Sequence, residues 1–177
     1  MKTTGLLAIL FVMMSIPAFG ADLTLFGGSQ DPGVVTINSV PDAGDTITQI
    51  VKNPLKAGTF GIRFGSGRVL GHEGTIAYTN HFIDTNTSAF IFNSNIMVTI
   101  PFPIVKPYVT AGLGTFIVSG SGTTDIGAKF AYNYGGGVKV TPGPVGIRGD
   151  IRGYGLTGVN GETMNVVEVS IGVLFSF

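Results

Sequence analysis

Apolar and polar side chains alternate along the last twelve residues of the sequence, VVEVSIGVLFSF. The large apolar side chains of one parity are those of Val167, Val169, Ile171, Val173, Phe175 and Phe177. Successive side chains of a β-strand point to opposite faces, so this period of two predicts a strand with one apolar face. This pattern constrains the fold more strongly than any other feature, because it recurs along most of the chain.

The same alternation predicts seven further strands upstream. VGIRGDIRGYGL, for example, places Ile147 and Ile151 opposite Arg148, Asp150 and Arg152. The 28 glycines also favour an all-β chain, because each glycine costs about 1 kcal/mol relative to alanine inside a helix. The predicted strands cover residues 23–30, 59–66, 74–82, 89–100, 108–118, 129–140, 145–156 and 165–177.

The connections between these strands fall into two classes. Those after the second, fourth and sixth strands are short, whereas those after the odd-numbered strands are polar, rich in glycine or long. Short turns at one end and longer loops at the other are typical of an outer-membrane barrel. The first connection, residues 31–57, is the longest. Its segments VVTIN and TITQIV either extend the first two strands or form a separate hairpin that offers a surface to a partner.

The charges of the predicted strands all fall on the face opposite the apolar one. In a barrel they would point into the lumen, since an Arg or Lys facing lipid at mid-depth costs about 2–4 kcal/mol. A water-soluble sandwich would also separate its faces, with the charges in water, so alternation alone leaves both architectures open. The segregated charges are those of Arg63, Lys129, Lys139, Arg148, Asp150, Arg152 and Glu168.

Three features favour the barrel. Phe60, Phe82, Phe175 and Phe177 lie near strand ends on the apolar face, where an aromatic girdle would be. Strands of about 10–12 residues suit a tilted membrane span better than the usual 5–6 residues of soluble sheets. Finally, the ending with Val173, Phe175 and Phe177 resembles the C-terminal signal that the barrel-assembly machinery reads in Gram-negative outer-membrane proteins. The predicted fold is an all-β, eight-stranded, antiparallel, up-and-down transmembrane β-barrel.

The resemblance extends to the last four strands. PYVTAGLGTF, YNYGGGVKV, GIRGDIRGYG and EVSIGVLFSF are similar to those of the small outer-membrane β-barrel domain family, which includes OmpA- and OmpX-type barrels. The similarity covers roughly residues 23–177. It implies an integral protein of the bacterial outer membrane. It also implies contact with outer-membrane lipids and lipopolysaccharide, and with the barrel-assembly machinery during biogenesis.

The N-terminus has the layout of a secretory signal peptide. Lys2 precedes an apolar run over residues 5–16, followed by Pro17 and by the small residues Ala18 and Gly20. The apolar run of 12 residues is short of the roughly 20 that a transmembrane helix needs. We therefore expect residues 1–20 to be cleaved and residues 21–177 to form the barrel domain.

The charged face predicts a network inside the lumen. An eight-stranded barrel has an interior only just filled by its side chains, so buried charges must lie beside opposite charges. We expect Glu168 and Asp150 to pair with some of the cations of that face. A catalytic or ligand-gating cluster is the alternative for the same residues. The predicted network comprises Arg63, Lys139, Arg148, Asp150, Arg152 and Glu168.

An enzymatic role is a further alternative, because small outer-membrane barrels include lipid A acyltransferases and deacylases. Acyl transfer needs a base beside a nucleophile. The two histidines are His72, in or beside a predicted short turn, and His81, which lies near Asp84 and Ser88. No motif of those enzymes surrounds either histidine, so we expect no enzyme.

The remaining expectations concern ligands and partners. The acidic turns lack the regularly spaced carboxylates of a calcium loop, and the chain has no Cys, so we expect no metal and no cofactor. Ten basic and ten acidic residues give no indication of nucleic-acid binding. We expect a monomer with a plugged lumen and a structural or surface-interaction role. The alternative is a narrow channel or conduit for small solutes or hydrophobic compounds.

Overall fold

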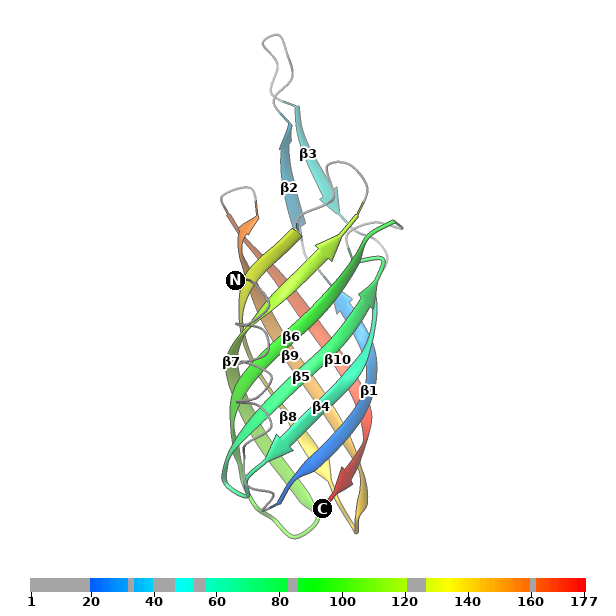
Figure 1. Cartoon of the computed structure of the whole chain (residues 1–177), viewed down its shortest axis with the longest axis vertical. Helices are drawn as coiled ribbons and strands as arrows, with labels where there is room; N and C mark the ends of the chain where they lie inside the picture. The colour runs from blue at the N-terminus through cyan, green and yellow to red at the C-terminus, as the bar shows by residue number, and fades with distance from the viewer. Residues whose placement is uncertain are drawn as a thin grey trace, which may run out of the picture.

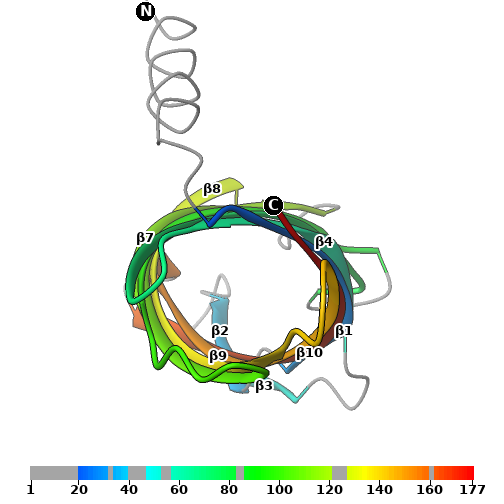
Figure 2. The same cartoon turned by 90° about the horizontal axis from the view of Figure 1, so that it is seen from below.

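Eight antiparallel strands close into one barrel in the computed structural model, in the order β1-β10-β9-β8-β7-β6-β5-β4 (Figures 1 and 2). This arrangement confirms the predicted fold class. The structure describes residues 20–31, 34–39, 47–52, 57–82, 86–120, 127–159 and 162–177, so the predicted signal peptide lies almost wholly outside the described residues. The barrel strands are β1 (Asp22–Asp31), β4 (Ala57–Ser66), β5 (Leu70–Asn80), β6 (Ser88–Thr99), β7 (Val105–Ser119), β8 (Gly127–Val140), β9 (Val145–Val159) and β10 (Glu162–Ser176).

The last strand closes the barrel against the first, as the sequence predicts. β10 pairs with β9 on one side and with β1 on the other, where Asp22 lies opposite Ser176. The amide of Phe177 continues this seam by donating to the carbonyl oxygen of Ala21 at 2.9 Å. Closure gives each of the eight described barrel strands a partner on both sides, which is the condition for a sheet that crosses a bilayer. Within the described residues, no helix is long and apolar enough to span a membrane.

The three short turns lie at one end of the barrel, which we call the short-turn end, together with the C-terminus (Figure 1). They cover residues 67–69, 100–104 and 141–144. Gly67 has a φ of 100°, and a Cβ there would lie 2.4 Å from the carbonyl oxygen of Leu70, so this tight turn requires glycine. β5 consequently begins at Leu70, four residues earlier than predicted.

The opposite end, which we call the long-loop end, carries a separate hairpin. β2 (Val34–Ser39) and β3 (Ile47–Lys52) pair only with each other, with Val34 opposite Lys52 and Ser39 opposite Ile47. Figure 1 shows the hairpin projecting beyond the barrel on the side away from the C-terminus. Of the two predicted alternatives for residues 31–57, the structure has the separate hairpin.

Large apolar side chains cover the outside of the barrel, which we call the outer wall, as the alternation predicts. Phe60 and Phe177 are 58% and 79% exposed, and Phe175 is half-buried. The prediction for Phe82 was wrong: it is fully buried and packs against Phe116, with ring centroids 5.8 Å apart. The cause is His81, which follows β5 with a φ of 53° and breaks the alternation. Phe82 therefore turns into the lumen.

Candidate functional site: an ion-pair network inside the barrel

β9 supplies half of a buried cluster of charged side chains. Arg148, Asp150 and Arg152 occupy alternate positions, so all three point into the lumen, about 6.8 Å apart along the strand. Arg63 of β4, Glu73 of β5 and Glu168 of β10 complete the cluster. None of these six residues is more than 4% exposed. We call them the ion-pair network.

Asp150 is the centre of the network. Its carboxylate accepts hydrogen bonds from Arg148 Nε at 2.9 Å, from Arg152 Nη2 at 3.0 Å and from Arg63 Nη1 at 3.1 Å. The hydroxyl of Tyr108 donates to the same carboxylate. A single carboxylate thus joins cations from two strands, β4 and β9.

The other two carboxylates link the network to two further strands, β5 and β10. Glu73 lies 2.5 Å from Arg148 Nη2 and 2.6 Å from Arg152 Nη2, which links β5 to β9. Glu168 lies 2.5 Å from Arg63 Nη2, which links β10 to β4. Three guanidinium groups therefore face three carboxylates. This balance is what burial requires, because an unpaired charge in a low-dielectric interior is strongly destabilising.

Lys139 belongs to a different pair. Its ammonium group lies 2.5 Å from the carboxylate of Asp22, nearer the short-turn end than the network. The two side chains are 6% and 13% exposed, so this pair is slightly more accessible than the network. The structure brings together Arg63, Arg148, Asp150, Arg152 and Glu168 and leaves Lys139 outside. Lys129, another residue of the charged face, is half-buried on the inner parity of β8.

Sequence reasoning missed two acidic members of these pairs, Glu73 and Asp22. Each lies just outside the predicted strand limits, which began at residues 74 and 23. The parity of Glu73 matches that of Thr75 and Thr79, which also face inward. Extending the alternation past the predicted strand limits would have found both carboxylates.

Two of the guanidinium groups lie over the faces of aromatic rings. The carbon of the Arg63 guanidinium lies 3.6 Å from the centroid of the Phe26 ring, and that of Arg148 lies 4.7 Å from the Tyr108 centroid. The cations are thereby fixed in position as well as neutralised. Because each carboxylate is already engaged by guanidinium groups, the arrangement is suited to joining the walls of the barrel and offers no free base.

Comparison with known proteins supports the same architecture. Residues 5–177 match the family model described as outer membrane protein beta-barrel domain. The chain belongs to this family. Members of the family are bacterial outer-membrane proteins, and the transmembrane placement of the eight strands fits them. No curated protein matches the sequence significantly.

Solved structures of the outer membrane β-barrel type share the fold at low sequence identity. Neisserial surface protein A aligns with a TM-score of 0.62 and 15% identity, over 91% of this chain and 98% of that one. The N-terminal barrel domain of Pseudomonas aeruginosa OprF gives 0.57 and 13%, over 88% and 97%. The outer membrane enzyme PagL gives 0.52 and 12%, over 87% and 98%. At these identities the likeness concerns the fold alone.

The histidines of this outer membrane β-barrel protein lie away from the network. His72 lies in β5, beside the first short turn, and its Nε2 lies 2.8 Å from the hydroxyl of Ser94 on the outer wall. His81 is exposed beyond the end of β5, while Asp84 lies outside the described residues. Among the residues that the structure describes, no three His, Cys, Asp or Glu side chains are grouped so that they could hold a metal ion.

Proposed function

We propose that this protein is an integral outer-membrane barrel with a closed lumen and a structural or surface-interaction role, and that it is not an enzyme. The observation that carries the proposal is the set of buried side chains that point into the lumen. The ion-pair network joins β5 to β9, which lie on opposite walls, and a packed apolar cluster lies between it and the long-loop end.

The apolar cluster supports a barrier to ions. Phe116 is fully buried between Phe82 and Tyr154, with ring centroids 5.8 Å and 5.2 Å away. Ala89 and Leu156, near the long-loop ends of β6 and β9, are also fully buried. A hydrated ion entering this layer would lose its water without gaining polar partners, which is strongly unfavourable. A closed lumen leaves the outer surfaces of the molecule as the places where it acts.

The outer wall supports insertion in a membrane. The exposed large side chains of the barrel strands are aliphatic or aromatic, and the arginines of β4 and β9 are buried inside. We propose that residues 1–20 direct export and that the barrel-assembly machinery reads Val173, Phe175 and Phe177. In the membrane the protein is a monomer surrounded by outer-membrane lipids and lipopolysaccharide.

The β2–β3 hairpin is the candidate surface for interaction. It stands apart from the barrel at the long-loop end, and its strands pair only with each other (Figure 1). One of the structurally similar proteins is itself a surface protein, Neisserial surface protein A. We propose that this end faces the exterior of the cell and presents the hairpin to a partner.

Single-channel recording on the refolded protein tests the closed lumen. We expect no stable conductance steps from the wild-type chain. Reproducible steps would contradict the proposal and favour the alternative function, a conduit for small solutes.

A separate experiment tests the proposal that the protein is not an enzyme. The protein is incubated with lipopolysaccharide, and the mass of the lipid A is measured by mass spectrometry. Gain or loss of an acyl chain would contradict that proposal.

A further inference from the structure

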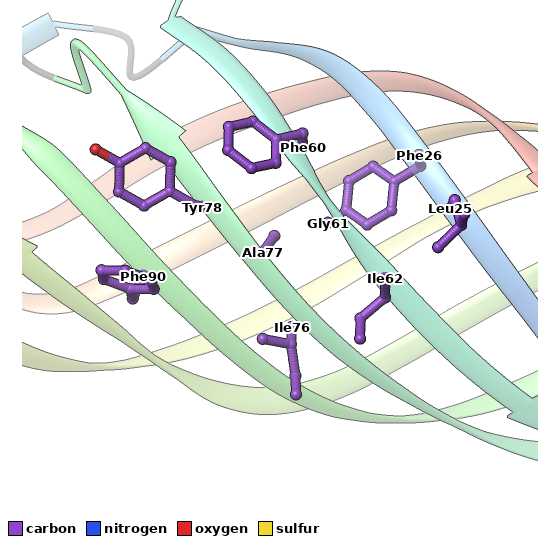
Figure 3. A pocket seen from close by; sticks show the side chains of 9 residues that line it. All are labelled: Leu25, Phe26, Phe60, Gly61, Ile62, Ile76, Ala77, Tyr78 and Phe90. Carbon is purple, nitrogen blue, oxygen red and sulfur yellow. The ribbon is translucent and has the colours of Figure 1, made fainter.

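The outer wall is hollowed between β1, β4, β5 and β6. The hollow is an open groove of about 550 Å³ whose lining is apolar apart from the hydroxyl of Tyr78. Figure 3 shows its side chains on these neighbouring strands, with the Tyr78 hydroxyl pointing away from the middle of the group. We call this hollow the wall groove.

Two rows of side chains run across the strands and form the sides of the wall groove. Phe60, Tyr78 and Phe90 lie opposite one another in register, and their rings pack along the row at centroid distances of 5.5 Å and 5.0 Å. The second row lies two residues nearer the short-turn end on each strand, where Ile62 lies opposite Ile76. The rows are therefore separated by about 6.8 Å along the strands. The three packed rings form a stiff ridge on the side nearer the long-loop end.

The floor of the wall groove consists of two small residues and the ring of Phe26, which lies opposite Gly61 on β1, and one end of the ridge is open. Gly61 and Ala77 lie opposite each other between the two rows. Gly27 lies opposite Phe60 in the ridge row, on the outer parity of β1, but contributes no side chain. A Cβ at Gly27 would have its nearest neighbour 3.9 Å away, so a larger residue fits there without strain on the backbone. The row is thus interrupted by a gap that leads into the groove.

We propose that the wall groove binds one acyl chain of a membrane lipid from the leaflet nearer the long-loop end. The groove is continuous with the outer wall, on which Leu25, Phe60 and Phe90 are each about half exposed, so in a membrane hydrocarbon surrounds it. No charged residue lines it, which excludes a headgroup anion as the main contact. A chain in the groove gains dispersion contacts on three sides that a flat wall does not provide.

The position of Tyr78 indicates the leaflet. Tyr78 is two residues from Asn80, the last residue of β5 at the long-loop end. Tyrosine is enriched where hydrocarbon meets polar headgroups, because its ring is apolar and its hydroxyl is polar. The lipid headgroup would accordingly lie beyond Tyr78, with its chain running into the groove. This inference does not depend on whether the lumen is closed.

Native mass spectrometry of the refolded chain tests the inference, with dipalmitoyl phosphatidylethanolamine as the probe. Gly27→Leu fills the gap in the ridge row. Gly149→Leu is the matched control, because Gly149 lies on the outer parity of β9 with nothing within 4 Å of a Cβ. We expect wild type and Gly149→Leu to retain one lipid. Gly27→Leu should bind about tenfold more weakly, a loss of about 1.4 kcal/mol.

A second pair of variants guards against misfolding of Gly27→Leu. Phe60→Ala removes part of the ridge, whereas Phe130→Ala removes a similarly exposed ring from the outer wall of β8. Of these two variants, we expect Phe60→Ala to lose the lipid and Phe130→Ala to retain it. Equal retention by all variants, or none by wild type, would overturn the proposal. If the wild-type protein retained free palmitate as well as it retains the phospholipid, a membrane lipid would no longer be the assigned occupant. If the wild-type protein formed a dimer and Gly27→Leu abolished it, the groove would instead bind a second copy of the chain.

Discussion

The guanidinium of Arg63 lies against the face of the Phe26 ring, 3.6 Å from its centroid, while two of its nitrogen atoms reach two different carboxylates. One residue of β4 thereby contacts side chains of β1, β9 and β10. The planar group fits this position because its face and its edge are used at the same time. An ammonium group has the charge but not the shape.

Arg63→Lys should therefore destabilise the barrel. The lysine can reach only one of the two carboxylates, so we expect the free energy of unfolding to fall by about 1.5–3 kcal/mol. Urea unfolding of the refolded protein, followed by circular dichroism, measures this. The control is Arg68→Lys in an exposed turn, for which we expect a change within about 0.5 kcal/mol. Equal effects of the two substitutions would show that the geometry of Arg63 is unimportant.

Glu73→Ala should have a larger effect than Asp22→Ala. Glu73 is the link between β5 and two arginines, and its removal leaves an excess of buried positive charge, which costs about 3–5 kcal/mol. Asp22 is partly accessible and pairs with one lysine, which water can reach after the substitution. The same urea titration ranks the two variants. The reverse order would place the more important pair at the short-turn end.

Phe82→Ala tests the inward position of this ring. A buried aromatic residue leaves a cavity when it is truncated, and we expect a loss of about 3–5 kcal/mol. Phe60→Ala changes a ring that is 58% exposed on the outer wall, so its effect on the free energy of unfolding should be smaller. If the Phe60 variant were the less stable of the two, Phe82 would belong to the outer wall after all.

Cysteine labelling of intact cells tests the orientation of the barrel. The chain has no Cys, so one introduced thiol is the only reactive site. We expect Asn38→Cys, in β2, to react with a membrane-impermeant maleimide, and Gly143→Cys, in a short turn, to react only after the cells are opened. Gly143 has nothing within 4 Å of a Cβ, so the substitution itself should be harmless. The opposite labelling pattern would invert the proposed topology.

Phe177→Asp should impair assembly more than folding. Phe177 is 79% exposed, so its loss removes less than the roughly 1.5–3 kcal/mol of a fully buried side chain. We expect a low level in the outer-membrane fraction of cells but near-normal refolding in detergent. Phe102→Asp is the control, because Phe102 is also exposed at the short-turn end but lies in a turn. Normal levels of the Phe177 variant in the membrane would contradict the proposed signal.

Alternation predicted the strands and their two faces, because each strand has one face toward packed side chains and one toward apolar surroundings. The strand lengths, the aromatic residues near strand ends and the C-terminal pattern then favoured the barrel over a sandwich. Alternation failed where the backbone departs from a regular strand. His81, with its positive φ, reverses the direction of Phe82, and the tight turn at Gly67 moves Glu73 into β5.

The alternation places the charged residues on one face, but it does not show which pairs join different strands. Arg148 meets Asp150 on its own strand, but its contact with Glu73 depends on how β5 and β9 face each other across the lumen.

The seam between β1 and β10 also has a consequence for how the chain reaches its native state. Asp22 and Ser176 lie opposite each other although 154 residues separate them along the chain, the difference between their numbers. Loop-closure entropy must be overcome before such distant contacts stabilise anything, and topologies of this kind fold slowly. The first strand therefore has an unpaired edge until β10 has been synthesised. Throughout that delay, the apolar faces of the barrel strands are exposed, and a factor other than the chain itself must protect them from aggregation.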